Sequence, residues 1–110
     1  MDATTVVRRL YDAANRHDLD AIPEIFAADF YSHPMRTTGL DPVRAAWRSI
    51  MERHPSLRIE PIEMIVSGDR VAVWSRVHHG AGEPATMMEM IRVADDRIAE
   101  VWGLSTLRRG

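Results

Sequence analysis

Hydrophobic positions change period partway along the chain, from the spacing typical of helices to the alternation typical of strands. Apolar side chains on one side of residues 4–16 predict a first amphipathic helix. A short second helix is predicted around Ile22 and Ile25, followed by a short extended segment over residues 30–33. The Asp41-Pro42 pair is a strong helix start signal and predicts a third helix that stops at Pro55.

After Pro55 apolar and polar residues alternate, which predicts four strands at about residues 57–66, 70–79, 85–93 and 97–106. Short turns join them, so we expect an antiparallel meander. The alternation slips at Pro61, which predicts a bulge and hence a sharp bend in the sheet. The pattern therefore predicts an α+β fold with three N-terminal helices packed on a strongly curved, mostly antiparallel sheet that encloses a cavity.

Composition narrows the class of protein. The chain has 110 residues, 45% of them hydrophobic and 27% charged, as expected for one globular domain spanning residues 1–110. A formal net charge of −2 argues against a nucleic-acid partner. The absence of cysteine excludes disulfides and thiolate chemistry. No membrane-length apolar run and no secretory pattern are visible, so we expect a cytoplasmic protein that does not bind membranes.

Ionisable residues in the strand half are the candidates for chemistry. Trp74, Arg76 and His78 share one face of their strand, opposite a simpler apolar face that we take as the core face. Glu89 lies between methionines, and an apolar setting would raise its pKa and suit it to donate or accept a proton near neutrality. The alternative for Glu89 is a structural ion pair with Arg76 or Arg92.

His33 precedes Pro34 at the end of the extended segment, where an imidazole could take a proton from a bound substrate. The alternative is an ordinary solvated loop histidine. His78 and His79 are adjacent in a strand and point to opposite faces, so we expect no metal site, and no cofactor motif is present. Large side chains would line a cavity or simply pack in the core: Tyr31, Trp47, Met51, Trp74 and Met87.

Several segments together resemble a known family. Residues 11–22, Phe26-Ala27-Ala28-Asp29 and Ser32-His33-Pro34 resemble the opening of SnoaL-like polyketide cyclases and ketosteroid isomerases, within the nuclear transport factor 2-like superfamily. Residues 68–73 and 96–102 resemble that superfamily's strand signatures. The resemblance implies a cone-shaped α+β barrel with a ligand pocket at its open end, and a homodimer. It does not fix the reaction, because this fold carries many activities.

The resemblance also implies roles for individual residues. His33 corresponds to the catalytic base of the isomerases, Glu89 to their protonated oxyanion-hole acid, and Trp47 to a pocket aromatic. Their oxyanion-hole tyrosine aligns with Leu10, so Tyr11 is expected to point elsewhere. Gly103 departs from the pattern, because cyclases and limonene-type epoxide hydrolases carry a working Asp directly after the last-strand Trp.

Two functions follow, with a third kept open. The first is a cofactor-independent isomerase, cyclase or lyase that moves protons on a hydrophobic carbonyl compound, polyketide-like or steroid-like. In it His33 is the base, Glu89 is the acid, and Arg76 and His78 add positive potential. The second is a non-catalytic small-molecule binder of the same fold. The third is an interaction domain with a solid interior.

Overall fold

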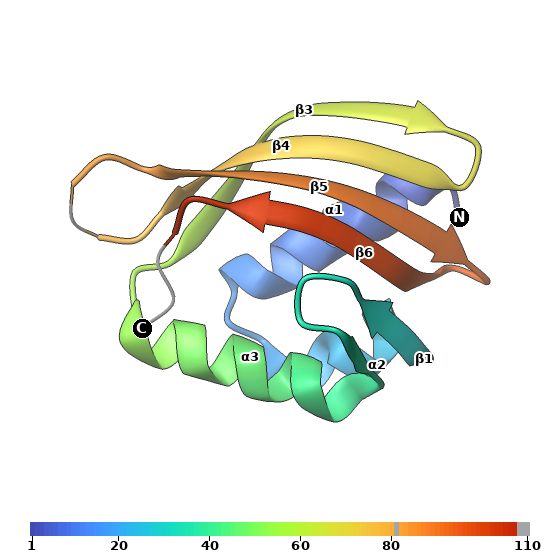
Figure 1. Cartoon of the computed structure of the whole chain (residues 1–110), viewed down its shortest axis with the longest axis horizontal. Helices are drawn as coiled ribbons and strands as arrows, with labels where there is room; N and C mark the ends of the chain where they lie inside the picture. Colours follow the sequence, from blue (N-terminus) through green and yellow to red (C-terminus); the bar gives the residue numbers. More distant parts are fainter. Residues whose placement is uncertain (81, 108–110) are drawn as a thin grey trace.

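The computed structural model describes residues 1–80 and 82–107. Three α-helices and a 3-10 turn lie on a six-stranded sheet with the order β2-β1-β6-β5-β4-β3 (Figure 1). The helices are α1 (Ala3–Asn15), α2 (Ile22–Ile25) and α3 (Leu40–Arg53), with the 3-10 turn at Leu19–Ala21. The strands are β1 (Phe26–Ser32), β2 (Thr37–Thr38), β3 (Arg58–Ser67), β4 (Arg70–His78), β5 (Ala85–Ala94) and β6 (Arg97–Ser105).

Strands β3 to β6 form the predicted antiparallel meander, and β1 joins its far edge parallel to β6. The register between β3 and β4 shifts between Pro61 and Glu63, which confirms the predicted bulge. A second shift, in the β5–β6 pairing after Arg92, adds to the bend. The predicted α+β class and three-helix arrangement are confirmed, and the sheet stays open rather than closing into a barrel.

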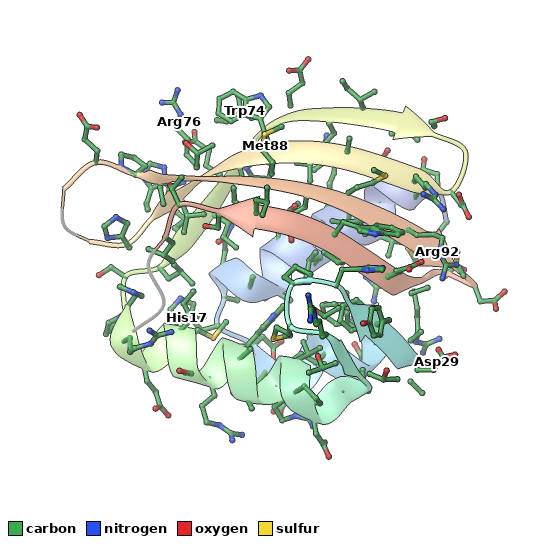
Figure 2. All side chains as sticks on the ribbon, in the orientation of Figure 1. His17, Asp29, Trp74, Arg76, Met88 and Arg92 are labelled. Carbon is green, nitrogen blue, oxygen red and sulfur yellow. The ribbon has the colours of Figure 1, made fainter. Side chains whose placement is uncertain are left out.

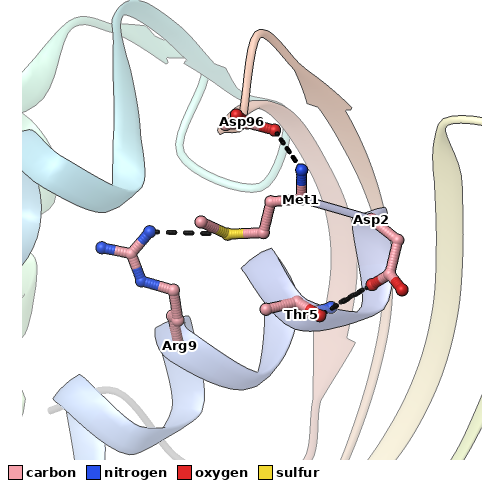
Figure 3. Close-up of polar contacts among 5 residues, drawn as sticks. All are labelled: Met1, Asp2, Thr5, Arg9 and Asp96. Atoms are coloured by element: carbon pink, nitrogen blue, oxygen red, sulfur yellow. Dashed lines mark hydrogen bonds and ion pairs between the residues drawn. The ribbon is translucent and has the colours of Figure 1, made fainter.

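Helix α1 lies across the sheet and contacts β3, β4 and β5. Its start is fixed locally: the Asp2 carboxylate caps the helix by accepting a hydrogen bond from the Thr5 amide at 2.8 Å (Figure 3). The Met1 amino nitrogen lies 3.4 Å from an Asp96 carboxylate oxygen in the β5–β6 turn. These contacts fix the position of the α1 N-terminus relative to the sheet. The position of α1 in turn sets where Tyr11 lies over the sheet.

The helices cover one face of the sheet, and the core forms there. Val71 and Val73 of β4, Ile91 of β5 and Ile98 of β6 are all nearly fully buried on this helix-facing side. A second, smaller cluster lies toward the ends of β4 and β5 and is built on Leu57, Val77 and Ala85. In the described part of the chain, no helix combines the length and apolar character needed to cross a bilayer.

Candidate active site

The opposite face of the sheet has no helices on it, and this decides where several predicted site residues lie. Along β4, Val71, Val73, Ser75 and Val77 are buried, whereas the residues between them are exposed or half-buried. Arg76, His78 and Trp74 therefore project from the outer face, and Figure 2 shows Trp74 and Arg76 on the side away from α3. The prediction that they face the interior is wrong.

These three side chains lie outside because the helices cover only one face of the sheet, and that face has to hold both the core and any interior site. A sheet with helices on a single side has only one interior surface. The prediction gave the apolar face of β4 to the core and the polar face to a cavity, so it needed an enclosed interior on both sides of the sheet. Arg76 lies over the Trp74 ring at 5.7 Å, and the His78 Nε2 lies 3.0 Å from a Glu60 carboxylate oxygen. Both side chains are thus paired on the outer face.

His33 also lies on the outer face. Its Nε2 lies 2.6 Å from Glu100 Oε2, and its ring stacks on Trp102 with 4.5 Å between centroids. Arg92 donates to the other Glu100 oxygen at 2.9 Å. The hydrogen bonds from His33 and Arg92 lower the pKa of Glu100. Tyr31 contacts the His33 ring edge-on at 4.8 Å and belongs to the same outer cluster, so it does not line the interior as predicted.

Glu89 is the ionisable candidate that the structure places inside. It shares the helix-facing side of β5 with Met87 and Ile91, and its residue is half-buried. Tyr11 Oη donates a hydrogen bond to Glu89 Oε1 at 2.7 Å, between residues 78 apart in sequence. Among the described residues, no cation forms an ion pair with Glu89. The alternative of a structural ion pair with Arg76 or Arg92 is therefore wrong, as is the expectation that Tyr11 points elsewhere.

The environment of this pair favours its neutral forms. Burial raises the pKa of Glu89 above the ordinary value of 4.5, and the hydrogen bond from Tyr11 offsets this only in part. Burial raises the pKa of Tyr11 as well, and the nearby Glu89 charge raises it further. A carboxyl group with a raised pKa and a neutral partner can both accept and return a proton near neutrality.

Gly103 makes room for Glu89. The two residues are directly opposite in the β5–β6 ladder, so a side chain at 103 would project from the same face. A Cβ placed on Gly103 would lie 3.1 Å from the Met88 carbonyl oxygen and 3.2 Å from Glu89 Cγ. The first contact is with backbone, which cannot move cheaply. The glycine therefore leaves room for the Glu89 side chain on the inner face.

Ser75 adds an unused hydroxyl next to this pair. It is 1% exposed on the helix-facing side of β4, and its register places it diagonal to Glu89. Its Oγ has no hydrogen-bond partner within the described residues. A weak interaction of its hydroxyl with the Tyr11 hydroxyl, outside full hydrogen-bond geometry, lowers the pKa of Tyr11, although burial and Glu89 have larger effects in the other direction. Burying a hydroxyl without a hydrogen-bond partner costs folding free energy. Ser75, Tyr11 and Glu89 thus place three polar groups close together in the otherwise apolar interior.

Helix α3 packs loosely on the rest of the molecule. Of its apolar stripe only Val43 is buried, while Trp47, Ile50 and Met51 are half-buried. Its main contacts are with β1, α2 and the 3-10 turn rather than with β5 or β6. The Trp47 ring meets Phe26 edge-on at 6.0 Å. Trp47, Ile50 and Met51 thus keep part of their surface exposed to solvent.

Two hollows are open at the surface. One of about 670 Å³ lies where β1 separates from β6, with Tyr31, Arg92 and Glu100 in its lining. The other, of about 390 Å³, lies beyond the C-terminal end of α3, with His54, His79 and Ala85 in its lining. Neither lining includes Glu89. The predicted cavity shared by the candidate residues is wrong, because Glu89 lies on the inner face of the sheet and His33 and Arg76 lie on the outer face. In the described ranges, no three His, Asp or Glu side chains are grouped for a metal ion.

Tyr11 is a candidate site residue that the sequence did not indicate, and the structure brings it into hydrogen-bond contact with Glu89. It lies on the apolar stripe of α1 with Val7 and Leu10, which already placed it toward the core. A tyrosine on such a stripe needs a partner for its hydroxyl when buried, and Glu89 was the one acid predicted in an apolar strand environment. The need of the Tyr11 hydroxyl for a buried partner was therefore the sequence feature that could have indicated its contact with Glu89.

Comparison with known proteins places the chain among relatives. A model of the SnoaL-like domain matches residues 7–101. The fold is similar to that of IdmH from Streptomyces antibioticus, a candidate polyketide cyclase, with 22% identity, a TM-score of 0.82, and 96% and 93% of the two chains covered. A candidate polyketide cyclase from Sinorhizobium meliloti has 26% identity, a TM-score of 0.81, and 94% and 100% coverage.

A SnoaL-like protein of unknown function from Burkholderia thailandensis is 28% identical, with a TM-score of 0.77 and coverage of 94% and 93%. No curated protein sequence matches the chain at a meaningful level. These likenesses extend over nearly the whole chain, including the strands that carry Glu89 and Gly103.

Proposed function

Because this chain belongs to the SnoaL-like domain family, we propose that it is a cofactor-independent enzyme that moves protons on a neutral, hydrophobic carbonyl compound, as an isomerase, cyclase or lyase does. The observation that carries the proposal is the 2.7 Å hydrogen bond from Tyr11 to the half-buried Glu89 on the inner face of the sheet. The name of the Sinorhizobium meliloti protein supports the same reaction class.

Glu89 is the acid/base group in this proposal. Its ionised carboxylate takes a proton from the carbon next to the substrate carbonyl: the C–H bond breaks, an O–H bond forms on Glu89, and the electron pair moves onto the carbonyl oxygen as an enolate. The protonated Glu89 then returns the proton to another carbon of the same system. The enolate carbon can instead attack a second carbonyl within the substrate, and Glu89 protonates the resulting alkoxide.

Tyr11 supports Glu89 in both states. Its hydroxyl donates to Oε1, which leaves Oε2 of Glu89 for the substrate. With no cation paired to Glu89 in the described chain, a carboxylate or phosphate at the reacting end of a substrate would be repelled. The apolar surroundings from Trp47 and Met87 suit an uncharged ring or chain.

The test is exchange of carbon-bound hydrogen for deuterium in a panel of cyclic and linear ketones, followed by NMR. We expect Glu89→Gln to lower the exchange rate by about 10²–10⁴-fold, the usual contribution of a positioned base. Glu63→Gln, an exposed residue on β3, is the matched control and retains the rate. Full exchange activity in Glu89→Gln contradicts the proposal. Saturable ketone binding without exchange by the wild type favours the non-catalytic binder instead.

We also infer that the partner is a second copy of this chain, bound through the outer sheet face. Ile65, Met88, Met90 and Leu104 are 63%, 60%, 40% and 83% exposed there. These four side chains form an apolar patch, and pairs of oppositely charged residues lie on either side of it. A second copy can therefore place its apolar patch on this one and its charges against opposite charges at the rim. Sedimentation of wild type and Met88→Glu tests this: a wild-type dimer and a monomeric variant support it, and a wild-type monomer at high concentration contradicts it.

A further inference from the structure

The buried polar residues of the described chain are two serines, and their hydroxyls differ. The Ser32 oxygen accepts a hydrogen bond from the Met35 amide at 3.3 Å. The Ser75 oxygen is shielded from solvent and, within the described residues, has no hydrogen-bond partner. Alanine at position 75 would fill nearly the same space without burying a hydroxyl. The Ser75 hydroxyl therefore costs folding free energy that its own strand does not return.

Ser75 and Glu89 lie on the helix-facing side of adjacent strands, two positions apart in register. Ser75 pairs with Met87, whereas Glu89 pairs with Val73. Residues in such diagonal positions are about 7–8 Å apart. Among the described residues, no hydrogen bond joins Ser75 to Glu89 directly. A group that interacts with both side chains has to come from the helix that lies over these two strands.

Tyr11 is that group. Helix α1 contacts both β4 and β5, and Tyr11 is buried beneath it. Its Oη donates to Glu89 Oε1 at 2.7 Å. Burial and the Glu89 charge raise the pKa of Tyr11, whereas an interaction with the Ser75 hydroxyl lowers it. The phenol hydroxyl thus interacts with the serine of β4 and with the carboxyl group of β5.

The available hydrogens set the direction of these interactions. Tyr11 has one hydroxyl hydrogen and gives it to Glu89, so its oxygen is left to accept from Ser75. Donation by Ser75 favours negative charge on the phenol oxygen, which agrees with its lowering effect on the pKa of Tyr11. A hydroxyl that accepts one hydrogen bond donates a stronger one, because consecutive hydrogen bonds polarise each other.

We propose that Ser75 is a positioning residue of the site: its hydroxyl donates to Tyr11 Oη and strengthens the hydrogen bond by which Tyr11 holds Glu89. The two hydroxyls lie outside full hydrogen-bond geometry in the structure, so the proposal includes a small side-chain adjustment that satisfies both. The hydrogen bond stabilises the ionised form of Glu89. Its existence is independent of catalysis, whereas its effect on proton transfer rests on the proposed function.

The first measurement detects the hydrogen bond without changing Ser75. In an equal mixture of H2O and D2O, a hydroxyl that exchanges slowly gives two resolved carbon-13 signals for the carbon that carries it. We expect two signals for Ser75 Cβ and for Tyr11 Cζ in the wild type. Tyr11→Phe removes the acceptor, so the two Ser75 signals merge into one. A single Ser75 signal in the wild type, or two that persist in Tyr11→Phe, overturns the proposal.

The second measurement follows the Glu89 carboxyl group by carbon-13 NMR titration. Ser75→Ala is expected to raise the pKa of Glu89, by less than Tyr11→Phe does, because Ser75 acts through Tyr11. Adding Ser75→Ala to Tyr11→Phe is expected to cause no further rise. Ser32→Ala removes the other buried serine hydroxyl and leaves the Glu89 titration unchanged. An unchanged or lower Glu89 pKa in Ser75→Ala, or an equal rise in the Tyr11→Phe background, contradicts the proposal.

The third measurement is the pH profile of ketone hydrogen exchange. Because the ionised Glu89 is the base, the rate rises with pH through its pKa. In Ser75→Ala this rise is expected at higher pH, with exchange below it slower by about two- to threefold, the ratio that corresponds to a weak net hydrogen bond. An exchange profile identical to the wild type contradicts the role of Ser75. A wild type without exchange overturns the proposed function and leaves the two NMR tests of Ser75 in force.

Discussion

Two glutamates on neighbouring strands show how differently the two faces of this sheet treat a carboxyl group. Glu89 on β5 faces the helices, has a neutral phenol as its partner, and its pKa is raised by burial. Glu100 on β6 faces outward between His33 and Arg92, and these hydrogen bonds lower its pKa. The two faces thus shift the pKa of the same side chain in opposite directions, toward the protonated form on the inner face and toward the anion on the outer face.

The difference teaches that polar residues near an aromatic cluster do not by themselves mark an active site. The outer cluster has more of the features usually sought, namely a histidine, a carboxylate, an arginine and a tryptophan. Its charges compensate one another, so none needs a substrate. The inner pair has fewer groups, namely Glu89 and Tyr11. Among the described residues, no cation compensates the charge of the Glu89 carboxylate.

The strongest test of the inner face is to remove the space beside Glu89. Gly103→Ala places a Cβ about 3 Å from the Met88 carbonyl and from Glu89 Cγ, and overpacking of this kind costs about 1–3 kcal/mol. We expect a lower unfolding free energy in urea and loss of ketone exchange. Leu104→Ala, on the exposed outer face, is the control and is expected to retain exchange. An alanine variant with wild-type stability and exchange would show that Glu89 does not depend on this space.

A smaller effect is expected from removing the phenol hydroxyl. Tyr11→Phe deletes the hydrogen bond to Glu89, a loss of about 0.5–1.5 kcal/mol in unfolding free energy. Because that bond lowers the pKa of Glu89, its removal raises this pKa further. Tyr31→Phe on the outer face leaves the Glu89 titration unchanged. A Glu89 pKa that falls in Tyr11→Phe is the result that would break this part of the account.

The smallest effects are in the pH dependence of stability, and they have opposite signs. The raised pKa of Glu89 gives stability that is complete below 4.5 and is lost as pH rises through the folded-state value. The lowered pKa of Glu100 gives stability that is present above 4.5 and is lost as pH falls through its folded-state value. Urea midpoints of Glu89→Gln and Glu100→Gln against wild type should therefore diverge in opposite directions, and parallel curves disagree with this assignment.

Much of the fold was predictable because it depends on local signals. The period change after Pro55, the Asp41-Pro42 helix start and the phase slip at Pro61 each appear in the structure within a residue or two. The parallel pairing of β1 with β6 was not predictable, because it joins segments about seventy residues apart in the sequence. The sequence pattern of β1 predicted only a short extended segment. Chain order alone says little about such a pairing.

The site was predictable only in part. The burial of the Glu89 carboxyl group was expected from its apolar strand, and burial does raise its pKa. The flanking Met88 and Met90 lie on the exposed outer face, so the burial comes from other residues. The error over Arg76 and His78 came from giving the sheet a second interior on its polar face, whereas the helices cover the apolar face alone. The error over His33 came from the role that the family resemblance implied for it. Tyr11 required a tertiary contact to be recognised, and Gly103 acquires its meaning only from the residue opposite it in the ladder.

The central claim is that the inner carboxyl group alone is tuned for proton transfer. Carbon-13 NMR titration of the glutamate side-chain carboxyls, assigned with Glu89→Gln and Glu100→Gln, measures this directly. The account predicts that Glu89 titrates above 4.5 and Glu100 below it. A Glu89 that titrates at or below the Glu100 value would contradict it.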